Sequence, residues 1–85
     1  MKPRHAAALA LMGWYLLIPT PGHYDAPLSY WGHYDSYDTA KECSEAQLEL
    51  VKRAENPNWK DPRLPVGSVK ASECIASDDP RLKQQ

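Results

Sequence analysis

Two copies of the tetrapeptide Gly-His-Tyr-Asp, starting at Gly22 and Gly32, carry the side chains best suited to chemistry. Alternate residues of an extended strand point to the same face, so each copy would present an imidazole and a carboxylate together. Both groups are ligands of Zn²⁺, and imidazole also suits copper. The sequence therefore allows a Zn or Cu site with four ligands, namely His23, Asp25, His33 and Asp35. The competing interpretation is a pair of exposed polar turns with tyrosines packed beneath them, because the first copy lies in a proline-bounded loop.

Cysteine chemistry would depend on Cys43 and Cys74, the only two cysteines of the chain. A redox-active pair is usually a close Cys-x-x-Cys motif with one acidic thiol, and this chain lacks that motif. In an exported protein the simplest interpretation is a structural disulfide, with metal or redox use as the alternative. Closing a loop of about 32 residues would stabilise the fold by roughly 3.7 kcal/mol, compared with about 5–15 kcal/mol for whole domains.

A second internal repeat consists of Asp61-Pro62-Arg63-Leu64 and Asp79-Pro80-Arg81-Leu82. Asp before Pro favours a turn, because proline fixes φ while the carboxylate accepts nearby backbone N–H groups. The arginine can then pair with an acidic neighbour such as Asp78. The second copy, close to the C-terminus, is also a candidate recognition surface, made by Asp78, Asp79 and Arg81.

Catalytic motifs are missing from the sequence. It has no Gly-x-Ser-x-Gly elbow, no His-Glu-x-x-His and no phosphate-binding glycine loop. The adjacent carboxylates of Asp78 and Asp79 would point apart in an extended chain. We therefore expect a protein that is not an enzyme and that needs no cofactor, unless the Zn or Cu site forms.

The N-terminus has the features of an export signal. A short basic segment, residues 1–5, precedes the uncharged run 6–18. A helix of that length spans roughly 20 Å, well short of the roughly 30 Å hydrocarbon core, so no stable membrane span is expected. It fits a secretory h-region, which predicts a periplasmic or secreted protein. Cleavage after Ala10 or as late as residue 22 is compatible with the small residues there. The alternatives are an uncleaved N-terminus that anchors the chain weakly to a membrane, and a buried segment of a cytosolic domain.

Length and charge limit the remaining choices. The chain has 85 residues and a formal net charge of −1, with basic and acidic residues interspersed. This length allows one small domain, expected at residues 13–80 after a signal-like segment at 1–12 and before a polar tail at 81–85. The balanced charge gives no reason to expect nucleic acid as a partner. An unknown protein or a small ligand is the expected partner.

The expected elements are strand, strand, helix and strand, in that order. The apolar run 14–18 and the segment 30–37 are predicted strands, the second with Trp31 and Tyr37 facing inward. Thr39-Ala40-Lys41-Glu42 matches a capping box and predicts a helix over residues 39–55, which ends before Asn56-Pro57. Its apolar face is formed by Ala40, Cys43, Gln47, Leu50, Val51 and Ala54. An irregular connector, with Val66 and Val69 as buried anchors, then leads to a strand within residues 68–77. The fold class is α+β, a two- or three-stranded sheet with one helix and a Cys43–Cys74 disulfide.

Three segments together resemble those of a family of small uncharacterised exported bacterial proteins. They are a Gly-Trp-Tyr-Leu segment at residues 13–16, an aromatic-Asp-Thr-x-x-x-Cys helix start at 37–43, and a Cys-x-Ala-x-Asp-Asp-Pro-Arg-Leu end at 74–82. The resemblance covers most of the chain from Gly13 onward. It implies that residues 14–18 form the first strand after the signal sequence. The family carries no assigned activity, so the resemblance implies location and fold alone.

These observations favour a non-catalytic extracytoplasmic binding or structural module. Its expected contact surface is the aromatic and acidic region from Tyr24 to Asp35. The alternative is a periplasmic metal-binding protein that uses the two His-Tyr-Asp copies. A small enzyme inhibitor or accessory subunit is a third possibility that the sequence does not separate from the first.

Overall fold

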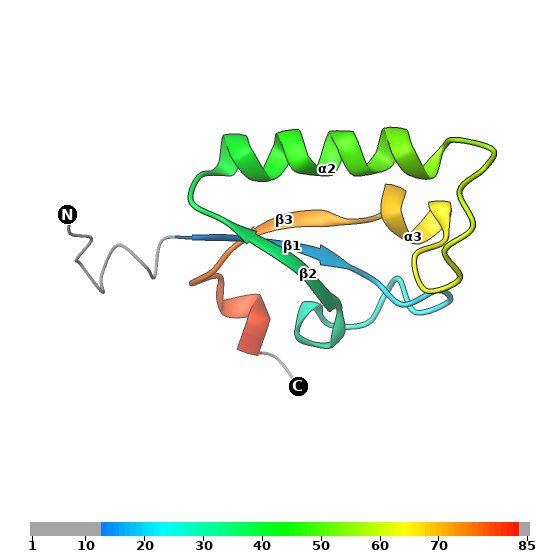
Figure 1. Cartoon of the computed structure of the whole chain (residues 1–85). Helices are drawn as coiled ribbons and strands as arrows, with labels where there is room; N and C mark the ends of the chain where they lie inside the picture. Colours follow the sequence, from blue (N-terminus) through cyan, green and yellow to red (C-terminus); the bar gives the residue numbers. More distant parts are fainter. Residues whose placement is uncertain (1–12, 84–85) are drawn as a thin grey trace.

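The protein is a three-stranded antiparallel sheet covered on one face by a helix (Figure 1). This computed structural model describes residues 13–83. The strands are β1 (Trp14–Ile18), β2 (Gly32–Tyr37) and β3 (Glu73–Ala76), and their order in the sheet is β2-β1-β3. The main helix is α2 (Ala40–Ala54). The α+β class and the order strand, strand, helix, strand are therefore confirmed. The expected signal-like segment at residues 1–12 and the last two residues of the expected tail lie outside the described residues.

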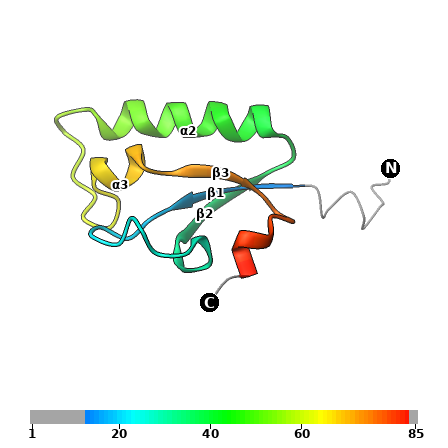
Figure 2. The same cartoon turned by 180° about the vertical axis from the view of Figure 1, so that it is seen from behind.

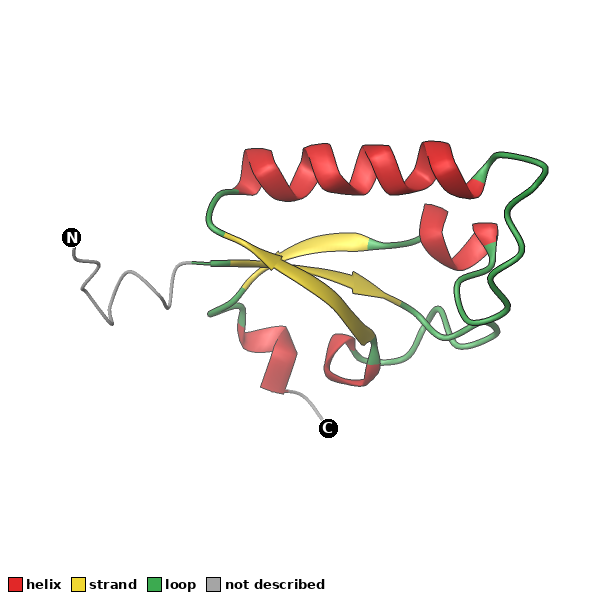
Figure 3. Ribbon diagram, viewed as in Figure 1, coloured by secondary structure: helices red, strands yellow, loops and turns green. Residues whose placement is uncertain are grey.

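Three shorter elements complete the chain. They are the 3-10 turn η1 (Leu28–Tyr30), the short helix α3 (Val66–Lys70) and the 3-10 turn η2 (Pro80–Lys83), with which the expected polar tail begins. The turns η1 and η2 contact each other on the side of the sheet away from α2 (Figure 3). Within residues 13–83, no helix combines the length and the apolar character that crossing a bilayer requires.

Strand β1 is the centre of the molecule because it is apolar on both faces. Leu16, Leu17 and Ile18 are all buried. Leu16 and Ile18 belong to the core cluster beneath α2, while alternation turns Leu17 to the opposite face. Seen from behind, β3 is the second edge of the sheet (Figure 2). A continuous apolar run is what a strand with neighbours on both sides and cover on both faces requires.

Helix α2 begins and ends where its capping residues predict. The Oγ1 of Thr39 accepts a hydrogen bond from the backbone N–H of Glu42 at 3.1 Å, as in a capping box. The helix ends at Ala54, three residues before Pro57, which cannot continue it. Its buried residues are Cys43, Leu50 and Ala54, while Ala40, expected on the same face, is exposed in the first turn.

The connector after α2 is more ordered than expected. It contains α3, a five-residue helix that is too short to leave a periodic pattern in the sequence. Of the two expected anchors, Val69 is fully buried in the core cluster, whereas Val66 is 40% exposed. The assignment of Val66 as an anchor is therefore wrong, because α3 turns that side chain away from the core.

The predicted disulfide joins α2 to β3. Cys43 and Cys74 are bonded, and their Cα atoms are 6.1 Å apart, within the usual range. Cys43 is fully buried and belongs to the core cluster, against which the half-buried Cys74 packs. The bond links two segments that are 31 residues apart in the sequence.

Replacing both cysteines should destabilise the fold severely. We expect the Cys43→Ala/Cys74→Ala variant to lose about 3.7 kcal/mol of unfolding free energy, because the unfolded chain regains the freedom of a loop of about 32 residues. Urea unfolding followed by tryptophan fluorescence measures the difference. A variant within about 0.5 kcal/mol of wild type would contradict this role for the bond.

Two buried serines near α3 offer a matched test of polar burial. Ser68 is fully buried, and its Oγ has no hydrogen-bond partner among the described residues. The Oγ of Ser72 donates to the carbonyl of Val69, and Gln47 Nε2 donates to that Oγ at 3.2 Å. The two hydroxyls are thus equally hidden from water but differ in hydrogen bonding.

Alanine should therefore be tolerated better at position 68 than at position 72. Ser68→Ala removes an unsatisfied hydroxyl and should leave stability unchanged or raise it by up to about 1 kcal/mol. Ser72→Ala removes a satisfied hydroxyl and should cost about 1 kcal/mol. Urea unfolding of both variants makes the comparison, and a larger loss at Ser68 than at Ser72 would contradict it.

Candidate functional site

A β-bulge in β2 separates the side chains of the second Gly-His-Tyr-Asp copy. His33 is opposite Leu17 of β1 and Asp35 is opposite Leu16, so Tyr34 is an extra residue in β2. Residues opposite each other in a sheet point to the same face. His33 therefore shares the face of Leu17 and Asp35 the face of Leu16. The expectation that His33 and Asp35 share one face is wrong, because the bulge interrupts the alternation.

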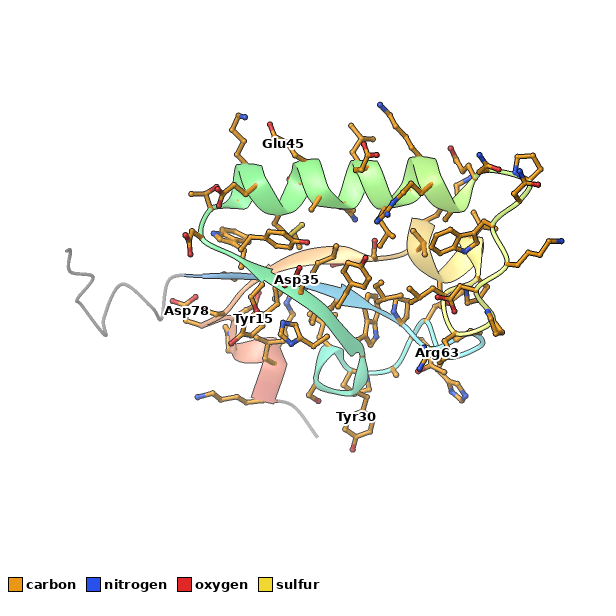
Figure 4. The ribbon with its side chains drawn as sticks, in the orientation of Figure 1. Tyr15, Tyr30, Asp35, Glu45, Arg63 and Asp78 are labelled. Carbon is orange, nitrogen blue, oxygen red and sulfur yellow. A yellow bond between two sulfur atoms is a disulfide. The ribbon has the colours of Figure 1, made fainter. Side chains whose placement is uncertain are left out.

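Side-chain contacts agree with this arrangement. The Nε2 of His33 is 2.9 Å from the Oγ of Ser36, and its ring centroid is 4.8 Å from that of Tyr15. Residues i and i+3 of a regular strand lie on opposite faces, so the His33–Ser36 contact depends on the bulge. Figure 4 shows Tyr15 on the side of the sheet away from α2. Asp35 is on the α2 side, where its charge acts on Tyr37.

The His33–Ser36 pair has two parts of a Ser-His-Asp arrangement and lacks the geometry of the third. In such a triad the aspartate carboxylate accepts a hydrogen bond from the other ring nitrogen of the histidine and orients it. The carboxylate of Asp35 instead accepts the backbone N–H of Ser36 at 2.8 Å, from the opposite face. Both His33 and Ser36 are exposed. We interpret their contact as a bond that fixes the bulge.

The first Gly-His-Tyr-Asp copy forms an exposed turn in the β1–β2 loop. Gly22 has φ of +82°, a conformation that favours glycine. The N–H of His23 donates to the carbonyl of Thr20 at 2.9 Å, and both His23 and Asp25 are exposed. Within residues 13–83, no three His, Cys, Asp or Glu side chains are grouped as a metal site would require. The four-ligand site is therefore not assembled, because one pair lies in a loop and the other is split across the sheet.

A cleft between side chains lies at the start of β2. Its volume is about 360 Å³. One wall is the end of β1 and the loop after it, one is the start of β2, and one is the connector between α2 and α3. Figure 3 shows the two connecting segments at the same end of the molecule. The lining residues are Ile18, Pro19, Thr20, Pro21, Gly32, His33, Tyr34, Arg63 and Leu64. We call this hollow the Arg63 cleft, because Arg63 is its only permanently charged lining residue.

The cleft stands on a fixed framework. Ile18 and Pro19 are buried. On the other wall, the Nε1 of Trp59 donates to the carbonyl of Leu64 at 2.7 Å and thereby holds the connector. Trp59 and Leu64 both pack against the core cluster. Residues that belong to the hydrophobic core or pack against it therefore hold two walls of the cleft in place.

Both Asp-Pro-Arg-Leu copies fold into the same turn. In each, the arginine backbone N–H donates to the aspartate Oδ1 at 2.9 Å, and the leucine N–H donates to the aspartate carbonyl. The predicted turn chemistry is confirmed. The guanidinium groups differ. Arg81 binds its own Asp79 through Nε at 3.1 Å and Nη2 at 2.9 Å, whereas Arg63 makes no ion pair with a described residue and lines the cleft.

Two of the three predicted recognition residues near the C-terminus therefore form an ion pair with each other. Arg81 pairs with Asp79, not with Asp78 as the sequence suggested. The hydrogen bonds from Arg81 lower the pKa of the Asp79 carboxyl. Asp78 is exposed beside this pair, close to the end of β3 (Figure 4). Asp79 and Arg81 thus close a turn, and only Asp78 keeps an unobstructed charge.

Exposed tyrosines gather around the β1–β2 loop. Tyr24, Tyr30 and Tyr34 are 48%, 63% and 41% exposed. A second hollow of about 330 Å³ adjoins them, lined by Thr20, His23, Ala26, Tyr30 and Trp31. Thr20 lines both hollows. The hydroxyl of Tyr24 lies so close to Gly67 that a Cβ there would be 3.0 Å from it, which ties this loop to α3. Residues of the predicted contact region from Tyr24 to Asp35 line both hollows: Tyr30 and Trp31 line the second, and His33 and Tyr34 line the Arg63 cleft.

No family model matches the chain, and neither a curated protein nor a solved structure shows significant similarity to it.

Arg63 and Leu64 are the site residues that the sequence reasoning missed. The repeat drew attention to them only as turn residues. The local signal that distinguishes the copies is the preceding residue, which is Lys60 in the first and Asp78 in the second. Since Arg81 pairs with Asp79 and not with Asp78, this difference does not account for the two arginines, and the sequence carries no local signal that does.

The placement of Asp35 on the α2 side can be tested through Tyr37. Burial, and then the negative charge of Asp35, raise the pKa of the Tyr37 phenol above its usual value. We expect Asp35→Asn to lower the pKa of Tyr37 but not to return it fully to the usual range, because burial remains. An NMR titration of the tyrosine ring resonances measures both values. Asp25→Asn is the matched control and should leave Tyr37 unchanged; a Tyr37 pKa indifferent to Asp35→Asn would contradict the placement of Asp35 beside Tyr37.

Proposed function

We propose that this protein is an exported, disulfide-stabilised binding module without catalytic chemistry of its own. Disulfides form and persist in oxidising compartments, which supports a periplasmic or secreted location. The Cys43–Cys74 bond is part of the core, so the fold that carries the site depends on that environment. The uncharged N-terminal run and the resemblance to exported bacterial proteins support the same location.

The gathering of exposed tyrosines carries the binding part of the proposal. Five large hydrophobic residues are exposed in the described chain, and three of them are Tyr24, Tyr30 and Tyr34. Tyrosine is enriched in binding surfaces because it offers a large apolar area and a hydroxyl at a low entropy cost. The surface is held by its framework rather than by ligands, since the Nε1 of Trp31 donates to the carbonyl of Ala26 at 3.0 Å. We call the surface from Tyr24 to Asp35 the tyrosine surface.

Site-specific crosslinking in the native host tests this function. A photoreactive benzoylphenylalanine at Tyr30 should give a discrete adduct in the extracytoplasmic fraction, because Tyr30 points away from the body of the molecule (Figure 4). The same residue at Leu48 is the matched control. Leu48 is 58% exposed, close to the 63% of Tyr30, but lies on α2 on the other side of the sheet.

The outcomes separate location from binding. Adducts from Tyr30 and not from Leu48 support the proposal. Equal adducts from both positions, or none, contradict a binding role for the tyrosine surface. A protein confined to the cytoplasm, with both cysteines open to alkylation before reduction, contradicts the location.

A further inference from the structure

The Arg63 cleft has the composition of a site for a small ligand with one charge. Its floor and walls are mostly apolar, formed by Ile18, Pro19, Pro21 and Leu64. A volume of about 360 Å³ is near the lower end of small-molecule pockets, which span about 300–1,000 Å³. Apolar walls with a few polar groups at one side are typical of sites that fix the orientation of an organic ligand.

The guanidinium of Arg63, an exposed residue, makes no ion pair with a described residue. The second copy shows that this turn places the arginine within reach of its own aspartate, since Arg81 forms two hydrogen bonds with Asp79. In the first copy the Asp61 carboxylate accepts only the backbone N–H of Arg63. The same four residues therefore pair the guanidinium with the aspartate of the turn at Arg81, but leave it unpaired at the cleft at Arg63.

One guanidinium and no other permanent charge among the lining residues favour a monoanion. A guanidinium binds a carboxylate through two parallel N–H···O bonds in one plane, so a single arginine is enough to pair both carboxylate oxygens. Phosphate groups carry more charge and are usually bound by several cations or by a helix N-terminus. The chemistry of the cleft therefore fits a carboxylate better than a phosphate.

The adjoining edge of β2 argues against a peptide added as a further strand. The bulge at Tyr34 interrupts the regular backbone of this edge strand. The N–H of Ser36 is already bonded to the carboxylate of Asp35. A bulge and a charged side chain at an edge are devices that prevent strand addition. The occupant is thus a compact molecule and not an extended chain.

We infer that the Arg63 cleft binds a small organic acid, with its carboxylate on Arg63 and its apolar body against Pro21 and Leu64. The inference rests on the proposed function, since it names a ligand class for a module that binds. The cleft shares Gly32, His33 and Tyr34 with the tyrosine surface, but Arg63 lies outside that surface and Tyr30 lies outside the cleft. Changes at Arg63 and at Tyr30 therefore test the two sites separately.

NMR titration of the oxidised full chain tests the inference with two probes, hexanoate and 3-phenylpropionate. We expect saturable amide shifts at Gly32, Tyr34 and Leu64 with at least one of them. The neutral amide 3-phenylpropionamide should bind at least about tenfold more weakly than the acid, because it cannot form a charge-assisted pair. Arg63→Gln should weaken binding of the acid by about the same factor. Arg81→Gln, at the equivalent position of the second Asp-Pro-Arg-Leu turn, is the matched control and should bind the acid as the wild type does.

Each remaining outcome would overturn the inference. No saturable shift with either acid up to 20-fold molar excess over about 1 mM protein excludes the ligand class, and so does equal binding of acid and amide. Equal losses in the Arg63→Gln and Arg81→Gln variants would show that Arg63 is not the anchor. If a tetrapeptide with a free C-terminus binds more tightly than both acids, the ligand is the C-terminal end of a peptide and not a small acid. Crosslinking at Tyr30 is independent, so its survival alongside a failed titration would reject this inference alone.

Discussion

The structure depends on a covalent link between two parts of the chain that meet around one apolar strand. Strand β2 leads almost directly into α2, and the first turn of α2 is bonded through Cys43 to β3, on the far side of β1. The bond therefore holds both edges of the sheet against its centre. A chain of 85 residues buries only about 60–65% of its unfolded surface, which leaves little stability from packing alone. Oxidation of the two cysteines therefore contributes a large share of the stability on which the sheet and its surfaces depend.

The bulge in β2 then determines what the sheet can present. It places His33 beside Tyr15 and Ser36 on one face and leaves Asp35 with Tyr37 on the other. This one inserted residue separates His33 from Asp35, so that they cannot share a metal ion. It also places His33 in contact with Ser36 and makes the β2 edge of the sheet irregular. The same insertion puts Tyr34 at the rim of the Arg63 cleft, so the feature that removes one chemistry contributes to another.

Local signals made most of the fold predictable. The capping box at Thr39, the apolar spacing after it and the two cysteines each act within a few residues or follow from composition, and the helix and the disulfide are confirmed. The bulge could not be predicted, because it exists only in the register between two strands. Helix α3 is held by the burial of Val69 and not by its own pattern. Tertiary packing decided every feature that the sequence reasoning missed, including the cleft.

The two Asp-Pro-Arg-Leu turns show how this limit applies to function. Identical residues with identical backbone bonds give a closed ion pair at Arg81 and an open charge at Arg63. The difference lies in what surrounds each turn. The end of β1 and the loop after it supply apolar walls at the first, and the second packs its 3-10 turn against η1 on the other side of the sheet. Arg63 is exposed and makes no ion pair with the carboxylate of its own turn, so its guanidinium is free to bind a carboxylate that a ligand brings to the cleft. The repeat therefore serves as an internal control, and the copy that departs from the self-satisfied arrangement is the one where binding is expected.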